Sequence, residues 1–122
     1  NYTAWTPDSG ATGYTQVDEA PAVDSDYVEA TAVNQRSTFS MDAVAEPIAL
    51  ATKFAGRILR SGTDAGANLK ITRRLSSTDY DETSEAAPGS GYIFRTWDQK
   101  AGGGGVTATD VDNTEYGVVS IT

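Results

Sequence analysis

The stretch Ile48-Ala-Leu-Ala-Thr-Lys-Phe-Ala-Gly-Arg-Ile-Leu-Arg60 decides the fold. Read with a period of two, one face holds its large apolar side chains with one Thr and one Gly: Ile48, Leu50, Thr52, Phe54, Gly56 and Ile58. The other face holds cations, small residues and one Leu: Ala49, Ala51, Lys53, Ala55, Arg57 and Leu59. Successive side chains of a strand point to opposite faces, so this pattern places an apolar face on a core and cations in solvent.

A helix is the competing interpretation of this stretch, because Ala, Leu, Lys and Arg are good helix formers. At the helical period, however, the cations fall close to the apolar stripe, which leaves a poorer apolar face. Gly56 in the middle of the run also counts against a helix. We therefore predict a long central β-strand.

The composition limits the classes of protein that remain. A chain of 122 residues is long enough for one domain with a real core and has no room for a second. It shows no apolar run that could span a membrane and no signal-peptide pattern. Because it starts at Asn1 without Met, we expect a processed chain or a fragment of a longer product. The absence of Cys and His excludes disulfides and thiolate metal sites and removes the commonest general base.

The charge of the chain bears on its partners. Seventeen acidic residues against nine basic ones give a net charge of −8. Proteins that bind nucleic acids neutralise phosphates with Lys and Arg, so we expect no nucleic-acid partner. The same charge argues against an anionic membrane surface. Its plainest consequence is solubility through repulsion between molecules.

The rest of the chain reads as short strands between turn signals. Strands are predicted over 2–6, 13–17, 27–33 and 36–41, a hairpin loop over 61–66, a returning strand over 67–75, a polar stretch over 76–91, and strands over 92–97 and 115–121. On the returning strand the inward residues are predicted to be Leu69, Ile71 and Leu75, and the outward ones Lys70, Thr72 and Arg74. We expect the cations of this strand pair to face the acidic loops.

Two further local patterns complete the fold prediction. Thr107-Ala-Thr-Asp110 matches a capping box, which predicts a short helix near residues 108–113. The Gly102–Gly105 run predicts a flexible connector and lacks the Lys of a phosphate-binding loop. About eight short strands with one short helix indicate an all-β, antiparallel β-sandwich that is jelly-roll-like. We expect residues 1–13 to form an N-terminal arm or edge strand and residues 14–122 to form a single sandwich domain.

The order of several motifs resembles a known group of proteins. The motifs are Val17-Asp-Glu-Ala-Pro21, Asp24-Ser-Asp-Tyr-Val28, the long strand Ile-x-Leu-x-x-x-Phe-x-x-Arg, the Tyr92-x-Phe…Trp97 strand, Val106-Thr-Ala-Thr-Asp-Val-Asp112 and Glu115-Tyr-Gly-Val118. In this order they are similar to small jelly-roll virion proteins of tailed bacteriophages, over roughly residues 15–122. The chain departs from that group in its run of glycines and in Val106, where Trp is common. The resemblance implies a non-enzymatic structural role in capsid decoration, a head fibre or a tail accessory protein.

Aromatic residues are the first candidates for a binding surface. They suit a sugar-stacking platform, as in jelly-roll carbohydrate-binding modules, but they also fill sandwich cores and anchor protein interfaces. Trp97 shares its strand phase with Ile93 in a dense apolar strand, which favours the core. Trp5, in a terminal strand, fits self-packing and contact with a neighbour equally well. The candidate partner-interface residues are Tyr2, Trp5 and Tyr14.

Acidic clusters are the second candidates. Three of them offer oxygen ligands at short spacing: Asp24-Ser-Asp26, Asp79-Tyr-Asp-Glu82 and Asp110-Val-Asp112. None matches a full calcium-loop consensus, and short acidic loops are usually solvated turns. Glycoside hydrolysis needs an acid of raised pKa beside a cleft, of which the sequence gives no sign. We therefore expect no catalytic residue, no metal and no cofactor.

Three functions are weighed. The first, which we favour, is a non-enzymatic phage virion protein on the outer surface of the particle. As a capsid decoration or head accessory subunit, it would bind the major capsid protein or another repeated virion protein, and it would itself be a homo-oligomer, for instance a trimer. The alternative is a carbohydrate-binding module or a tail-associated receptor-binding domain with a glycan ligand, indicated by at least two exposed aromatics on one sheet face. An enzyme is the third and least favoured function.

Overall fold

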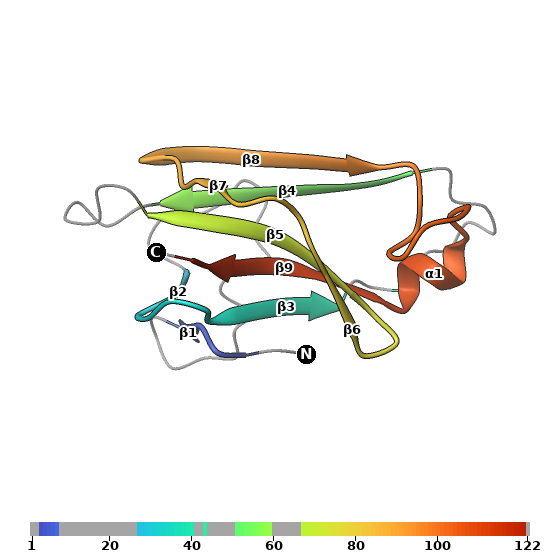
Figure 1. The fold of residues 1–122 in the computed structure, drawn as a ribbon, viewed down its shortest axis with the longest axis horizontal. Helices are drawn as coiled ribbons and strands as arrows, with labels where there is room; N and C mark the ends of the chain where they lie inside the picture. Colours follow the sequence, from blue (N-terminus) through green and yellow to red (C-terminus); the bar gives the residue numbers. More distant parts are fainter. Residues whose placement is uncertain (1–2, 8–26, 41–42, 44–50, 60–66, 122) are drawn as a thin grey trace.

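The computed structural model describes residues 3–7, 27–40, 43, 51–59 and 67–121. These residues form nine strands and one short helix (Figure 1): β1 (Thr6–Pro7), β2 (Val28–Glu29), β3 (Arg36–Ser40), β4 (Thr52–Leu59), β5 (Asn68–Leu75), β6 (Thr78–Asp81), β7 (Glu85–Ala86), β8 (Ser90–Trp97), α1 (Ala108–Asp112) and β9 (Thr114–Ser120). All pairings between these strands are antiparallel. The predicted fold class, all-β and antiparallel with one short helix, is confirmed, while the jelly-roll connectivity stays a prediction.

The strands build two main sheets that pack against each other (Figure 1). The larger sheet has the order β3-β9-β5-β6, with β7 also paired to β5, and the smaller sheet consists of β4 and β8. A separate short ribbon is formed by β1 and β2. The core between the sheets is made of side chains from β5, β8 and β9: Leu69, Ile71, Ile93, Trp97, Tyr116 and Val118. Phe54 and Ile58 of β4 pack against this cluster, as the alternation of their strand predicts.

Among the described strands, β9 rather than the long strand β4 takes a central position in a sheet. Among the described residues β4 has one partner strand, β8, whereas β9 lies between β3 and β5. The residues of β9 suit that position, because Gly117 brings its backbone close to β3: a Cβ there would clash with the Ser37 carbonyl oxygen. Lys53 of β4 is exposed, as expected for a strand whose outer face meets solvent.

The predicted hairpin between the long strand and the returning strand is wrong. β5 pairs with β9, β6 and β7, and β4 pairs with β8, so the two strands belong to different sheets. The predicted hairpin loop over 61–66 lies outside the described residues. The prediction failed because alternation determines which face of a strand is buried and carries no information about its partner. The inward placement of Leu69 and Ile71 is correct, since both are buried.

Several other predicted elements change in extent. The strand predicted over 27–33 reduces to β2, after which the chain turns, with Asn34 at a φ of 60°. The strand predicted over 13–17 lies outside the described residues. The stretch 76–91, predicted to be polar and to end in the strand breaker Pro88-Gly89-Ser90-Gly91, contains β6 and β7, and β8 begins within that breaker at Ser90. These two strands were not predicted, because their side chains are polar and face charged partners rather than a core.

The helix and its cap agree with the sequence. The Thr107 hydroxyl accepts a hydrogen bond from the Asp110 backbone N–H, and the Asp110 carboxylate accepts one from the Thr107 N–H at 3.0 Å. This reciprocal pair is the predicted capping box. Before it, the predicted glycine connector forms a closed turn in which Gly103 N–H donates to the Lys100 carbonyl. Gly102 needs to be glycine, because its φ is 89° and a Cβ would lie 2.8 Å from the Tyr80 hydroxyl.

The turn between β5 and β6 offers a direct test of this fold. Ser76 and Ser77 form its two central residues, and both have positive φ, 50° and 67°. Two-residue hairpin turns of this type favour Asn-Gly, because Asn and Gly tolerate positive φ better than Ser. We expect the double variant S76N/S77G to raise the free energy of unfolding by about 1 kcal/mol in urea titrations. The control Ser84→Gly, at an exposed position without positive φ, should leave stability unchanged or lower it; a gain as large as that of the turn variant would contradict the assignment.

Candidate functional site

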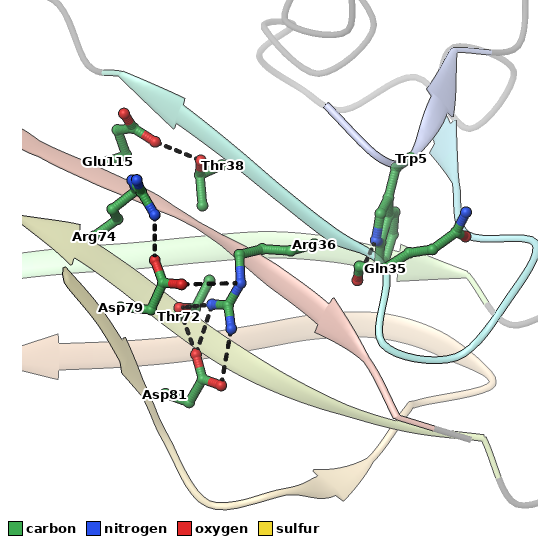
Figure 2. A network of polar contacts seen from close by, with 9 residues as sticks. All are labelled: Trp5, Gln35, Arg36, Thr38, Thr72, Arg74, Asp79, Asp81 and Glu115. Atoms are coloured by element: carbon green, nitrogen blue, oxygen red, sulfur yellow. Dashed lines mark hydrogen bonds and ion pairs between the residues drawn. The ribbon is translucent and has the colours of Figure 1, made fainter. Parts of the chain in front are cut away.

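The outer face of the larger sheet carries a network of charged and hydroxyl side chains (Figure 2). Arg36, from β3, reaches across β9 and donates to both carboxylate oxygens of Asp81 on β6, at 2.6 and 3.0 Å. It also donates to the Thr72 hydroxyl of β5 at 2.5 Å, and that hydroxyl donates to Asp81 at 2.8 Å. A bidentate Arg–carboxylate pair has fixed geometry, so this contact holds three strands in register.

A second group of contacts extends the network along the sheet. Asp79 accepts a hydrogen bond from Arg74 at 2.8 Å and lies 3.6 Å from the Arg36 Nε. The Thr38 hydroxyl donates to Glu115 at 2.5 Å (Figure 2). The expected meeting of the strand cations with the acidic segment after them is therefore confirmed for Arg74. The acidic cluster at 79–82, considered above for calcium, directs Asp79 and Asp81 to arginines.

Thr72 corrects a prediction within this network. It lies on the outward face, as expected, but it is fully buried rather than exposed to solvent. The Arg36 guanidinium covers it, and its hydroxyl both accepts from Arg36 and donates to Asp81. Hydrogen bonds to both partners satisfy the hydroxyl, so its burial carries no unmet polar group. Period-two patterning could not show this, because the covering side chain comes from a distant strand.

Between the sheets, polar groups surround the buried Trp97. Its indole N–H donates to Glu82 at 2.8 Å, and its ring lies 5.9 Å from that of Tyr116. The Arg73 guanidinium lies 4.4 Å from the centre of the Trp97 ring, and desolvation there lowers the pKa of Arg73. The predicted core position of Trp97 is confirmed. Glu82 is thus engaged inside the sandwich, close to the core.

The N-terminal segment forms an edge beside β3. Thr3 bridges to Ser37, the Ala4 N–H donates to the Arg36 carbonyl at 3.1 Å, and β1 then pairs with β2. Trp5 is half-buried: its indole N–H donates to the Gln35 carbonyl at 3.0 Å, and its ring packs against the core cluster (Figure 2). Tyr2 and Tyr14, the other two candidate interface residues, lie outside the described residues. The division into an arm over 1–13 and a domain over 14–122 stays a prediction.

The outer face of the smaller sheet exposes two aromatic side chains that were not among the three named partner-interface candidates. Tyr92 and Phe94 of β8 are 50% and 53% exposed, and their rings are 5.9 Å apart with an angle of 24° between their planes. The Nζ of Lys53 on β4 lies 5.1 Å from the centre of the Phe94 ring. The signal in the sequence was their shared phase, opposite to that of buried Ile93 and Trp97. We call this outer face, with Lys53, Tyr92 and Phe94, the aromatic face.

The comparisons with known proteins give no independent assignment. No protein-family model, curated protein or solved structure matches this chain. Within the described residues, no helix has the length and apolar character needed to cross a membrane. The same residues contain no group of three or more acidic, His or Cys side chains placed to hold a metal ion. Of the other two acidic clusters, 24–26 lies outside the described residues, and Asp110 of 110–112 caps the helix.

The network predicts how stability depends on pH. Hydrogen bonds from Arg36 and, to a smaller extent, from Thr72 hold the pKa of Asp81 below its ordinary value, against partial desolvation. The stabilisation from Asp81 is therefore complete above the pKa of an unfolded Asp, about 4, and is lost as the pH falls through the lower folded pKa. We expect Asp81→Asn to lower the free energy of unfolding at pH 7 by about 1 kcal/mol and to remove part of the loss seen on acidification.

Urea titrations between pH 7 and pH 2 measure this effect. The matched control is Asp98→Asn, which removes one exposed carboxylate outside the network. Equal pH profiles for the Asp81 variant and the original protein would show that the Arg36 contact does not contribute to stability.

Proposed function

We propose that this protein is a non-enzymatic accessory subunit of a tailed-phage particle, most simply a capsid decoration or head accessory protein on its outer surface. Two lines of support lead to this proposal. The order of the motifs over residues 15–122 resembles small virion proteins of such phages. The chain forms an all-β sandwich, and most of its described acidic residues form hydrogen bonds or ion pairs within the chain. Such a sandwich suits a binding module that is folded before it meets its partner.

The observation that carries the partner contact is the N-terminal edge. Thr3 to Pro7 run beside β3 and then pair with β2, so this edge of the sandwich is a short peptide segment that a partner can reach. Trp5 is anchored on its own chain and remains partly accessible, which is how aromatic interface anchors are commonly placed. We propose that Tyr2, Trp5 and Tyr14 together contact the major capsid protein or another repeated virion protein.

The proposed mechanism is passive. The sandwich presents its N-terminal edge to a symmetric lattice, and several copies assemble as a homo-oligomer, for instance a trimer around a symmetry axis. The net charge of −8 keeps neighbouring copies soluble and separate outside their specific contact. No catalytic step and no nucleic acid or membrane contact is part of this mechanism.

A second candidate function is favoured by one specific observation. The sequence criterion for a glycan-binding module was a row of at least two exposed aromatics on one sheet face, and Tyr92 and Phe94 form such a pair on the aromatic face. This candidate is a tail-associated or other receptor-binding accessory domain. It differs from the first in its ligand, a glycan, and in the face that contacts it.

The location of the chain in the particle tests the first proposal. We expect electron cryo-microscopy of purified particles to show many copies at symmetry-related positions, with the N-terminal edge at the contact. A chain that is absent from particles, or that is monomeric and has no affinity for capsid or tail proteins, would contradict the proposal.

Variants sharpen this test at the residue level. Trp5→Ala would also remove core packing, so a change in its binding would be ambiguous. Tyr2→Ser keeps the Trp5 side chain itself, and we expect it to weaken binding to particles about tenfold in co-sedimentation, as loss of an interface aromatic does. The control Thr83→Ala, at an exposed position between β6 and β7, should bind as the original chain does. Unchanged binding of the Tyr2 variant would remove this residue from the contact.

A further inference from the structure

The aromatic face differs in charge from the rest of the chain. In the register of β4 and β8, Lys53 stands opposite Thr96, Ala55 opposite Phe94, and Arg57 opposite Tyr92. These six positions include two of the nine basic residues of the chain and none of its seventeen acidic ones. The exposed side chain of Lys53 thus gives a chain with a net charge of −8 a local surface suited to negatively charged groups.

The two aromatic side chains are also exposed to water, where apolar surface is unfavourable. Tyr92 and Phe94 are about half exposed and next to each other, whereas Trp97 and Tyr116 are buried in the core. Single exposed apolar residues are common on protein surfaces, whereas contiguous apolar patches often mark a binding surface. Their rings offer apolar area, and Lys53 adds a cation beside Phe94.

The size of this face limits what can occupy it. Each strand has eight residues, so the part of the face that the structure describes is about 27 Å long, and its two strands make it about 10 Å wide. Its area is therefore roughly 300 Å², well below the 800 Å² or so that each partner of a stable protein complex usually buries. A narrow, extended ligand matches this shape better than a second folded protein.

We propose that the aromatic face binds an acidic polysaccharide that lies along β4 and β8. The C–H faces of successive sugar rings pack against Tyr92 and Phe94, and carboxylates of the sugar pair with Lys53. This inference deepens the second candidate function and rests on it, and it does not depend on the phage assignment. A single-stranded nucleic acid is the less favoured ligand, because two basic positions neutralise few phosphates in so acidic a chain.

Affinity electrophoresis in native gels tests the proposal with defined probes. The gels contain polygalacturonate, alginate, hyaluronate or polysialic acid, and dextran serves as the neutral polysaccharide. We expect at least one acidic polysaccharide to retard the chain, with dextran having little effect. Raising the salt concentration should weaken the retardation, because salt screens the contact between Lys53 and carboxylates.

Matched variants assign the binding to residues. Tyr92→Ser and Phe94→Ser should each weaken binding about tenfold, since an aromatic stacking contact contributes about that factor. Lys53→Gln should weaken binding and reduce its dependence on salt. The control Tyr27→Ser removes an aromatic that is 38% exposed and lies next to β2, outside the aromatic face, and should bind as the original chain does. Circular dichroism of each variant confirms that the exposed substitutions leave the fold intact.

The outcomes separate this inference from the proposed virion role. Absence of retardation by all four acidic polysaccharides, equal retardation by dextran, or stronger binding of a single-stranded oligothymidylate would each overturn the inference. So would loss of particle attachment in Phe94→Ser without loss of polysaccharide binding. Retardation that depends on Tyr92 and Phe94 supports the inference even if the chain is absent from phage particles, an outcome that would overturn only the virion proposal.

Discussion

The contact between Arg36 and Asp81 depends on β9, which lies between them. At the point where the Arg36 side chain crosses it, β9 has no side chain. Arg36 starts on β3, and its carboxylate partner lies on β6, with β9 and β5 between them. In register, Thr38, Gly117, Thr72 and Asp81 form one row across these four strands. Because Gly117 has no Cβ, β3 can lie close to β9, and the guanidinium can pass over the row to reach Thr72 and Asp81. One missing side chain thus permits the contact that links three strands.

This arrangement makes the two outer faces of the sandwich chemically different. On the larger sheet, Arg36 and Arg74 meet Asp79 and Asp81, so the charges of that face are largely paired within the chain. On the smaller sheet, β4 and β8 contribute aromatic, small and basic residues, and no acidic residue stands in the outward register rows. An internally paired surface has little free energy to gain from a partner, whereas exposed aromatics gain from being covered. The aromatic face is therefore the better candidate for a ligand.

The sequence was sufficient to predict properties that depend on local pattern. Alternation gave the buried faces of β4, β5 and β8, including the core position of Trp97, and the spacing of Thr107 and Asp110 gave the helix cap. The pairing of strands was not predictable in this way. The long strand was expected at the centre of a sheet with β5 as its hairpin neighbour, but both features depend on which distant strand supplies the better match. β6 and β7 were missed because their polar side chains carry no apolar alternation.

The difference between local pattern and the packing of distant strands also explains how much of the candidate sites could be predicted from the sequence. The Tyr92-Ile-Phe-Arg-Thr-Trp97 strand is aromatic at three positions, and only the location of the core decides which of these are exposed. Once Trp97 is inside, the period of two places Tyr92 and Phe94 outside. Thr72 behaves in the opposite way: it faces outward by the same rule and is nevertheless buried, since Arg36 comes from a strand 36 positions earlier to cover it.

The positions of the two candidate surfaces bear on how they can work together. Figure 1 shows β8 on one side of the molecule and β1, with the N-terminal segment, on the opposite side, with the larger sheet between them. A partner held at the N-terminal edge therefore leaves the aromatic face uncovered. Trp5 is hydrogen-bonded to Gln35, just before β3, and β3 is joined by Arg36 to β5, which contributes to the core together with β8. Attachment on one side and ligand binding on the other are therefore compatible in a single chain.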